Sequence, residues 1–308
     1  MINRVLIRIR VIQVLYSTYL NQSGDLKKAE NELIFSCQKS YDLYHYLLLL
    51  IIELTDNHAR RTEMRKGKLL PTSEDLNPSM RLVNNLFVKQ LRENEALNKY
   101  LLDRPMSWDE HDNYLKTLLS DILASDVYKE YLLVEDRNYD TDREFWRKIF
   151  KSYVYTDADL DEILENESVF WNDDIEIIES FVVKTIKKFD PEKGAKQQLL
   201  PMFKDEDDRQ FAIKLLRETM FNVKTARDLI DKYAKNWETE RIAFMDMIIM
   251  QTAIAELLAF PSVPINVTMN EYINIAKAYS TEKSSSFING ILDAVIVELK
   301  AENKLLKL

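Results

Sequence analysis

Three arginines stand among the first ten residues, in a segment that carries no acidic side chain before Asp25. The planar guanidinium group of arginine pairs with two phosphate oxygens at once, and such contacts give salt-dependent affinity for any polyanion. Arg4 and Arg8 are one helical turn apart, so a helix would place them side by side, with Arg10 nearby. We therefore predict that a polyanion would bind at Arg4, Arg8 and Arg10.

Residues that commonly perform catalysis or bind zinc are few in this chain. Cys37 is the only cysteine, and the three histidines, His45, His58 and His111, do not have the spacing of zinc ligands. Cys37 lies in an apolar helical segment, where a core position is expected. The sequence therefore predicts no active site and no enzyme.

Two acidic runs have part of the pattern of a metal site. The run Asp157–Asp161 is similar to the start of a calcium loop, but Glu162 stands where that loop needs glycine and Ser168 where it needs glutamate. The run Asp205–Asp208 could indicate a metal-dependent nuclease. Both runs also fit helix N-termini, where carboxylates interact favourably with the helix dipole, and we predict this role. Phosphate-binding loops and dinucleotide fingerprints are absent, so no cofactor and no metal are expected.

The charge of the chain is unevenly distributed. The formal net charge is −9, and from Ser152 to Val183 there is no lysine or arginine but many acids. A polyanion should therefore avoid the middle of the chain. The apolar run Tyr46–Ile52 is far shorter than the roughly 20 residues that span a bilayer, so a buried helix is expected there. A single cysteine and the arginines interrupting the first apolar stretch favour a soluble, cytoplasmic protein that does not contact membranes.

The hydrophobic pattern predicts an all-α fold. Apolar residues recur with helical periodicity almost everywhere, no stretch alternates like a strand, and only four glycines occur. A first helix is expected over about Ile2–Gln22, ended by Gly24, and a second from about Asp25 to Leu54. Residues 60–80 read as a loop. Capping-box spacings predict helix starts at Ser107 and Thr141, and a further helix is expected near Asp174–Lys188.

Residues 189–203 form the best domain boundary, because Pro191, Gly194 and Pro201 fall within them. A compact helical bundle is expected after this boundary. Its helices are predicted at about 205–222, 226–237, 239–259, 264–279 and 284–300.

Two separated segments resemble the NusB family. The N-terminal run Arg8–Tyr16 (RIRVIQVLY) is similar to the family's opening arginines followed by "QALY". The second segment is more specific and contains three blocks in family order. These are Asp246–Leu257, Val263-Pro264 with Asn270–Lys277 (NEYINIAK), and Ser286–Asp293 (SFINGILD), similar to "D-x-x-I-L-x-x-A-x-x-E-L", "VP…NEAIELAK" and "FVNGVLD". The resemblance covers about 130 residues.

The resemblance implies a NusB-like helical bundle with an additional helical insertion. The expected parts are N-terminal helices over 1–36, the insertion over 37–200 and a C-terminal bundle over 201–308. NusB proteins pair with NusE, a small-subunit ribosomal protein, to hold boxA RNA of nascent ribosomal transcripts within the antitermination complex of RNA polymerase. The resemblance therefore implies a transcription antitermination factor that binds boxA-type RNA and NusE and contacts no membrane.

The resemblance also implies particular site residues. Contacts with RNA are expected from Arg4, Arg8, Arg10, Tyr16, Gln22, Lys277, Lys283, Ser284, Ser285, Phe287 and Asn289. Contacts with the protein partner are expected from Asp246, Asn270 and Glu271. For Tyr16 and Phe287, stacking on unpaired bases and packing in the core are both open.

Two alternatives accompany this interpretation. Ribosomal RNA cytosine methyltransferases also carry a NusB-like domain, but they continue into a cofactor-binding domain with a catalytic cysteine, which is not expected here. The second alternative is a protein-interaction scaffold of the transcription or ribosome-assembly machinery with reduced RNA binding. The negative net charge favours this scaffold, as do Met247 and Gln251, which stand where relatives often have arginines. The role of the insertion stays open.

Overall fold

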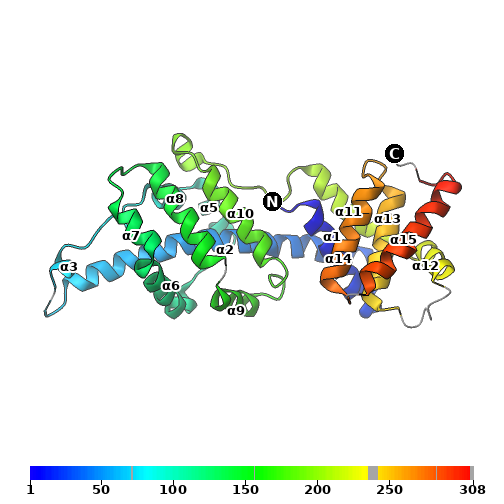
Figure 1. Ribbon diagram of the computed structural model, residues 1–308, viewed down its shortest axis with the longest axis horizontal. Coiled ribbons are helices and arrows are strands. Elements are labelled where there is room, and N and C mark those ends of the chain that lie inside the picture. Colours follow the sequence, from blue (N-terminus) through cyan, green and yellow to red (C-terminus); the bar gives the residue numbers. More distant parts are fainter. Residues whose placement is uncertain (71, 156, 235–241, 282, 306–308) are drawn as a thin grey trace. The chain divides into compact units, whose positions relative to one another are not determined.

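The computed structural model describes residues 1–70, 72–155, 157–234, 242–281 and 283–305 of the chain (Figure 1). The described residues contain helices and one isolated backbone bridge between Ile2 and Phe203, and no strand. The predicted all-α class is therefore confirmed. The chain divides into two compact units, which we call the terminal unit (Ile2–Gln38 with Met202–Leu308) and the central unit (Met1 with Lys39–Pro201). The boundaries predicted from the sequence lay at residues 36/37 and 200/201.

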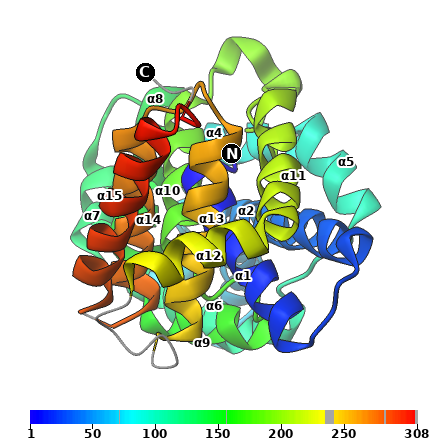
Figure 2. The same cartoon turned by 90° about the vertical axis from the view of Figure 1, so that its right-hand side faces the viewer.

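The terminal unit joins both ends of the chain in one helical bundle. Its helices are α1 (Arg4–Leu20), the start of α2 (Leu26–Lys66), α11 (Glu206–Phe221), α12 (Val223–Tyr233), α13 (Phe244–Ala259), α14 (Ile265–Tyr279) and α15 (Ser284–Ala301). Helix α13 is its centre, because every side chain from Asp246 to Leu257 is buried. A helix that is buried around its whole circumference needs neighbours on all sides, and α13 packs against α1, α11, α12, α14 and α15 (Figure 2).

The central unit continues α2 and adds a set of shorter helices. These are α3 (Ser73–Leu76), α4 (Leu86–Arg92), α5 (Glu95–Asp103), α6 (Asp112–Ala124), α7 (Asp126–Leu133), α8 (Tyr139–Ile149), α9 (Ala158–Glu167) and α10 (Ile175–Lys188). Short 3₁₀ turns at Asp109–His111 and Pro191–Lys196 and a π-helical turn at Phe150–Val154 complete it. The apolar run in α2 is buried, as predicted, with Leu47 and Leu50 fully inaccessible. None of the described helices combines the length and the apolarity needed to cross a bilayer.

Several helix ends differ from the sequence prediction. Helix α2 runs to Lys66, so the loop predicted over residues 60–80 begins later. The cations Arg65 and Lys66 stabilise its last turn, because the C-terminal end of a helix carries partial negative charge. Helix α1 ends at Leu20, and Gln22 rather than Gly24 takes the left-handed conformation after it, with φ of 51°.

The two predicted capping boxes are also wrong. The Ser107 hydroxyl accepts only from the Asp109 amide, and α6 begins five residues later. Helix α8 is capped by Asn138, whose side chain accepts from the Thr141 amide, three residues before the expected position. In contrast, the two acidic runs do mark helix starts, since Asp157 caps α9 and Asp205 caps α11.

Candidate nucleic-acid interface

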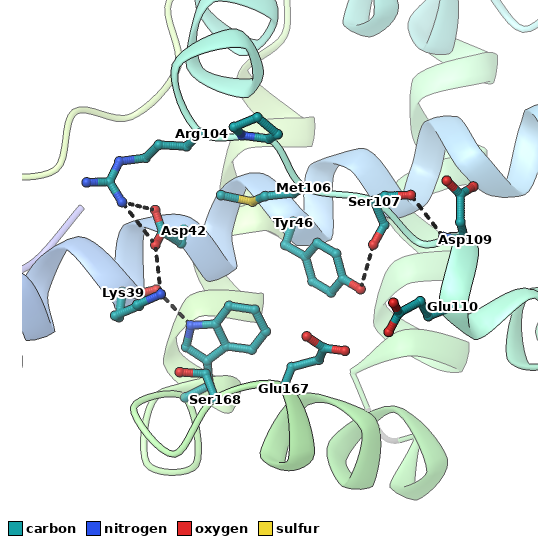
Figure 3. Close-up of a pocket in the computed structure, with 12 residues that line it drawn as sticks. Lys39, Asp42, Tyr46, Arg104, Met106, Ser107, Asp109, Glu110, Glu167 and Ser168 are labelled. Atoms are coloured by element: carbon teal, nitrogen blue, oxygen red, sulfur yellow. Dashed lines mark hydrogen bonds and ion pairs between the residues drawn. The ribbon is translucent and has the colours of Figure 1, made fainter.

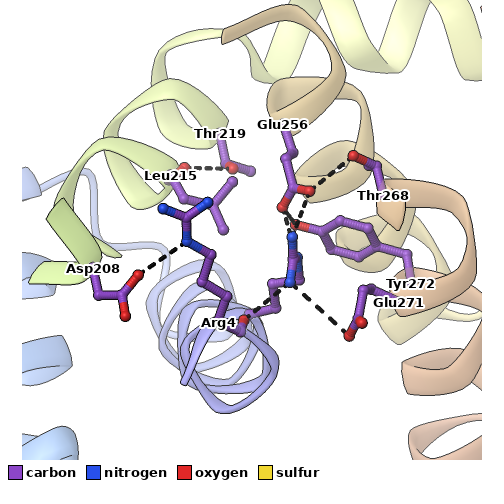
Figure 4. Close-up of polar contacts among 9 residues, drawn as sticks. Arg4, Asp208, Leu215, Thr219, Glu256, Thr268, Glu271 and Tyr272 are labelled. Atoms are coloured by element: carbon purple, nitrogen blue, oxygen red, sulfur yellow. Dashed lines mark hydrogen bonds and ion pairs between the residues drawn. The ribbon is translucent and has the colours of Figure 1, made fainter. Parts of the chain in front are cut away.

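Arg8 lies inside the terminal unit and forms a paired contact with Glu256, the acid that Figure 4 labels beside Thr268 and Tyr272. Arg8 Nε and Nη2 each donate to a different oxygen of the Glu256 carboxylate at 2.8 Å. The Arg8 side chain is 3% exposed and that of Glu256 is inaccessible. Helix α1 is thereby fastened to α13 by a buried, bidentate ion pair, the strongest geometry available to arginine and a carboxylate.

The remaining hydrogen-bonding capacity of Glu256 is used by α14. Thr268 Oγ1 donates to one carboxylate oxygen at 2.9 Å, and Tyr272 Oη donates to the other at 3.0 Å. Burial lowers the pKa of Arg8, but the hydrogen bonds and the charge of Glu256 outweigh it, so that the net shift is upward. Arg8 is therefore a fixed cation that joins three helices, and its charge is compensated inside the protein.

Arg4 occupies a more open position one turn earlier. Its Nε donates to Asp208 Oδ1 on α11 at 3.0 Å, and its side chain stays 42% exposed. Its guanidinium carbon lies 4.9 Å from the centre of the Phe211 ring, close enough for a cation–π contact. The Arg4 guanidinium therefore presents charge to solvent, while its partner Asp208 is 11% exposed.

Arg8 and Arg10 are both buried in this structure, and their expected contacts with RNA stay predictions. Arg8 is committed to Glu256, and Arg10 is 3% exposed with Nη1 donating to Gln13 at 2.8 Å. A buried guanidinium cannot reach a phosphate strand without leaving its partners behind in the interior. Of the three predicted arginines, only Arg4 presents its charge to solvent. The predicted residue Gln22 is exposed just beyond the end of α1.

The turn between α14 and α15 carries two exposed lysines. Lys277 and Lys283 are both exposed, and within the described part of the chain neither has an ion pair. Ser285 and Phe287 are half-buried in the first turn of α15, and Asn289 donates to Asp293 at 3.1 Å. The predicted residues of this turn thus fall into one local cluster.

Buried side chains hold this turn in place. Asp246, in the first turn of α13, accepts a hydrogen bond from the Ser280 hydroxyl. The Ser280 hydroxyl also pairs with the Ser284 hydroxyl at 3.0 Å, and Ser284 in turn pairs with Thr281 at 2.8 Å. Ser284 and Asp246 are each 4% exposed, and their expected contacts with a phosphate and a partner protein stay predictions. Their role in this structure is to fix the turn that presents the lysines.

Tyr16 approaches the same region from α1. Its ring lies 5.2 Å from that of Phe244, the first residue of α13. Phe244 precedes Asp246 by two residues, so Tyr16 contacts the same end of α13. The ring is half-buried, so packing and base stacking both remain possible for it. Arg4 precedes Tyr16 by twelve residues, about 18 Å along a helix, and lies at the other end of α1.

The predicted partner residues on α14 differ in exposure. Asn270 is exposed on the same helical face as Asn274 and Lys277. Glu271 is 26% exposed and lies 4.0 Å from Arg8, so that it adds to the charge balance of the buried arginine. Whether Asn270 and Glu271 contact a protein partner stays a prediction.

Sequence reasoning missed the residues that organise this interface from within. Glu256 lies within the Asp246–Leu257 block that resembles the family. A sequence pattern alone does not show that Glu256 pairs with Arg8, which is 248 residues away. A charged residue inside the otherwise apolar α13 was the available signal, because such a residue is rarely buried without a partner. Among the described residues, no cluster of three histidine, cysteine or acidic side chains could hold a metal ion.

The chain is similar to known proteins over part of its length. A model of the NusB family matches residues 174–297. The transcription antitermination protein NusB of Salinibacter ruber is 39% identical over 132 residues, which make up 41% of this chain and 82% of that protein. The NusB protein of Chloroherpeton thalassium is 44% identical over 99 residues, which make up 32% of this chain and 47% of that protein. The NusB protein of Koribacter versatilis is 41% identical over 100 residues, which make up 32% of this chain and 68% of that protein. No solved structure matches.

Proposed function

Because the chain belongs to the NusB family, we propose that it is a cytoplasmic transcription antitermination factor that binds boxA-type ribosomal RNA together with NusE. In this role it would help RNA polymerase, within the antitermination complex, to transcribe ribosomal RNA processively. The protein would act by binding, without catalysis and without a cofactor. The relatives named above are antitermination proteins, which supports the general role. The RNA element and the partner are our proposal.

The observation that carries the RNA assignment is the pair of exposed lysines on the α14–α15 turn. Lys277 and Lys283 lie at the two ends of this turn, and the Asp246–Ser280 contact holds it against α13. The half-buried Phe287 lies one turn further along α15, and Tyr16 contacts the start of α13. Exposed cations beside aromatic rings form the usual arrangement for binding single-stranded RNA, with phosphates on the cations and bases on the rings.

We expect the double substitution K277Q/K283Q to weaken RNA binding and to reduce its salt dependence. Each phosphate contact with a single strand contributes about 0.7 to the slope of log affinity against log salt concentration, so the slope should fall by about 1.4. The measurement is a filter-binding titration of the full chain with boxA RNA at several salt concentrations, with and without NusE.

The matched control is K214Q/K300Q, which removes the same charge at the far end of the bundle. Lys214 Nζ donates to the carbonyl oxygen of Ala259 at the end of α13, and Lys300 is exposed near the end of α15. This control should leave the slope unchanged. Equal slopes in K277Q/K283Q and the unmodified protein would show that RNA does not bind at this turn.

A protein-interaction scaffold is the second candidate. Burial of Arg8 and Arg10 favours it, because only Arg4 of the three N-terminal arginines can contribute charge to an RNA surface. Met247 and Gln251 are buried in α13 and add no charge either. The same titration separates the two functions. A scaffold predicts no binding of boxA RNA even at low salt, with or without NusE, and direct binding of NusE alone.

A further inference from the structure

The central unit contains a cavity of about 610 Å³ that the proposed antitermination function does not use. This volume is in the range of small-molecule sites, roughly 300–1,000 Å³. Side chains from α2, from the segment that joins α5 to α6, and from the segment around the end of α9 line it (Figure 3). All of these segments belong to the central unit.

Aromatic rings form one wall of the cavity. The Tyr46 ring from α2 stacks on Trp108 at 4.1 Å and lies 5.6 Å from Trp171. Both indole N–H groups donate to carbonyl oxygens of α2, Trp108 to Tyr46 and Trp171 to Lys39. With their polar atoms satisfied in this way, Tyr46 and Trp171 form a rigid, largely buried apolar border of the cavity. Met106 also lines the cavity (Figure 3).

Two carboxylates stand at the hydroxyl end of Tyr46. Burial, followed by the negative charges of Glu167 and Glu110, raises the pKa of Tyr46. The Tyr46 hydroxyl donates its proton to the Ser107 carbonyl oxygen at 3.2 Å, so it is not a hydrogen-bond donor to either carboxylate. Glu110 and Glu167 are exposed at the cavity rim, and Glu167 also contacts His111 at 2.8 Å. This end of the cavity therefore attracts positive charge.

The opposite end is closed by a charge network of its own. Asp42 is 4% exposed and accepts from Tyr100 Oη at 2.6 Å and from Arg104 Nη1 at 3.3 Å. Lys39 lies 3.8 Å from the same carboxylate. Asp42 thus offsets part of the positive charge of Arg104 and Lys39. Four carboxylates and two cations line the cavity as a whole, so its net charge is negative.

We propose that this cavity binds an organic cation, an ammonium or guanidinium group carried on a short apolar chain. The cationic group would lie between the Glu110 and Glu167 carboxylates at the hydroxyl end of Tyr46, where ion pairing with both acids would hold it. The chain would lie along Met106. A free polyamine and a lysine or arginine side chain of a protein share this chemistry, and the probes below distinguish them.

Isothermal titration calorimetry of the full chain tests the proposal with three cationic probes and one neutral probe. The cations are pentylammonium, spermidine and the peptide acetyl-Ala-Ala-Lys-Ala-Ala-amide, and the neutral probe is 1-pentanol. Pentylammonium should bind and 1-pentanol should not, because they differ mainly in charge. Tighter binding of spermidine than of the peptide would identify a free amine as the source, and the reverse order would identify a protein side chain.

The decisive variant is E110Q/E167Q, which removes both rim charges and keeps the side-chain shape. Binding of the cations should weaken by about tenfold or more. The control E135Q/E192Q makes the same change in net charge at two exposed acids outside the cavity and should bind as the unmodified protein does. Circular dichroism checks that both variants fold. Absence of heat with all three cations, or equal affinities in both variants, would overturn the proposal.

Discussion

Replacing Arg8 by methionine is expected to destabilise the protein by about 3–5 kcal/mol, which makes it the largest single-residue effect that we predict. Methionine fills much of the space of the arginine stem but leaves the Glu256 carboxylate without its cation. That carboxylate is inaccessible to water and keeps only Thr268 and Tyr272 as donors. A buried charge that loses its partner costs far more than the pair contributes, because its solvation is not recovered.

Urea unfolding followed by circular dichroism measures this effect as a lower transition midpoint. Arg4→Met is the matched control, since Arg4 lies one turn away on α1 but is 42% exposed in its ion pair with Asp208. Its loss should cost less than the loss of Arg8, because Asp208 lies in the first turn of α11, where the helix dipole also stabilises its charge. Equal destabilisation by the two substitutions would contradict the assignment of Arg8 as a buried anchor.

A double substitution separates the charge from the packing. In R8M/E256Q the buried negative charge is gone, and the glutamine oxygen can still accept a hydrogen bond from α14. The double variant should therefore lose less stability than the sum of the two single variants, and double-mutant-cycle analysis gives the coupling energy. This result also bears on RNA binding, because a test of the interface that changes Arg8 would measure unfolding instead of lost phosphate contacts.

Replacing Glu179 by glutamine is expected to stabilise the protein above neutral pH by a few kcal/mol. Glu179 lies in α10 of the central unit and is 1% exposed. Its Oε1 has no hydrogen-bond partner among the described residues. Burial, followed by the negative charges of Asp161, Glu176 and Asp157, raises the pKa of Glu179 from 4.5 to about 8.

The direction of the pH dependence follows from this raised pKa. The folded protein holds the Glu179 proton more tightly than the unfolded chain, so the contribution of Glu179 to stability is fully present below pH 4.5. It is lost progressively as the pH rises from about 4.5 to about 8, where the folded protein must place a charge in its interior. Glutamine stays neutral throughout this range and removes the dependence.

Urea unfolding at several pH values between 5 and 9 tests this prediction. The difference in unfolding free energy between E179Q and the unmodified protein should grow with pH and level off above about 8. The exposed Glu192→Gln is the control and should show no such growth. A difference that stays constant over the whole range would mean that Glu179 titrates normally in the folded protein.

Local sequence patterns predicted the helices better than they predicted where the helices end. Helix α13 was expected because apolar residues recur along it, and the structure buries it on all sides. The end of α2 was misplaced because the charged residues after His58 resemble a loop in composition. Arginine and lysine are good helix formers, however, and Arg65 and Lys66 interact favourably with the helix end.

The sequence by itself determined the all-α class and the family, because these depend on periodicity and on short motifs that are read locally. Only the tertiary structure decided which charges reach the surface. Arg4, Arg8 and Arg10 look equivalent in one dimension, yet packing of α1 against α11 and α13 exposes the first and buries the other two. The reason is physical: the availability of a charge depends on neighbours such as Glu256, which are distant in the chain and brought close only by folding.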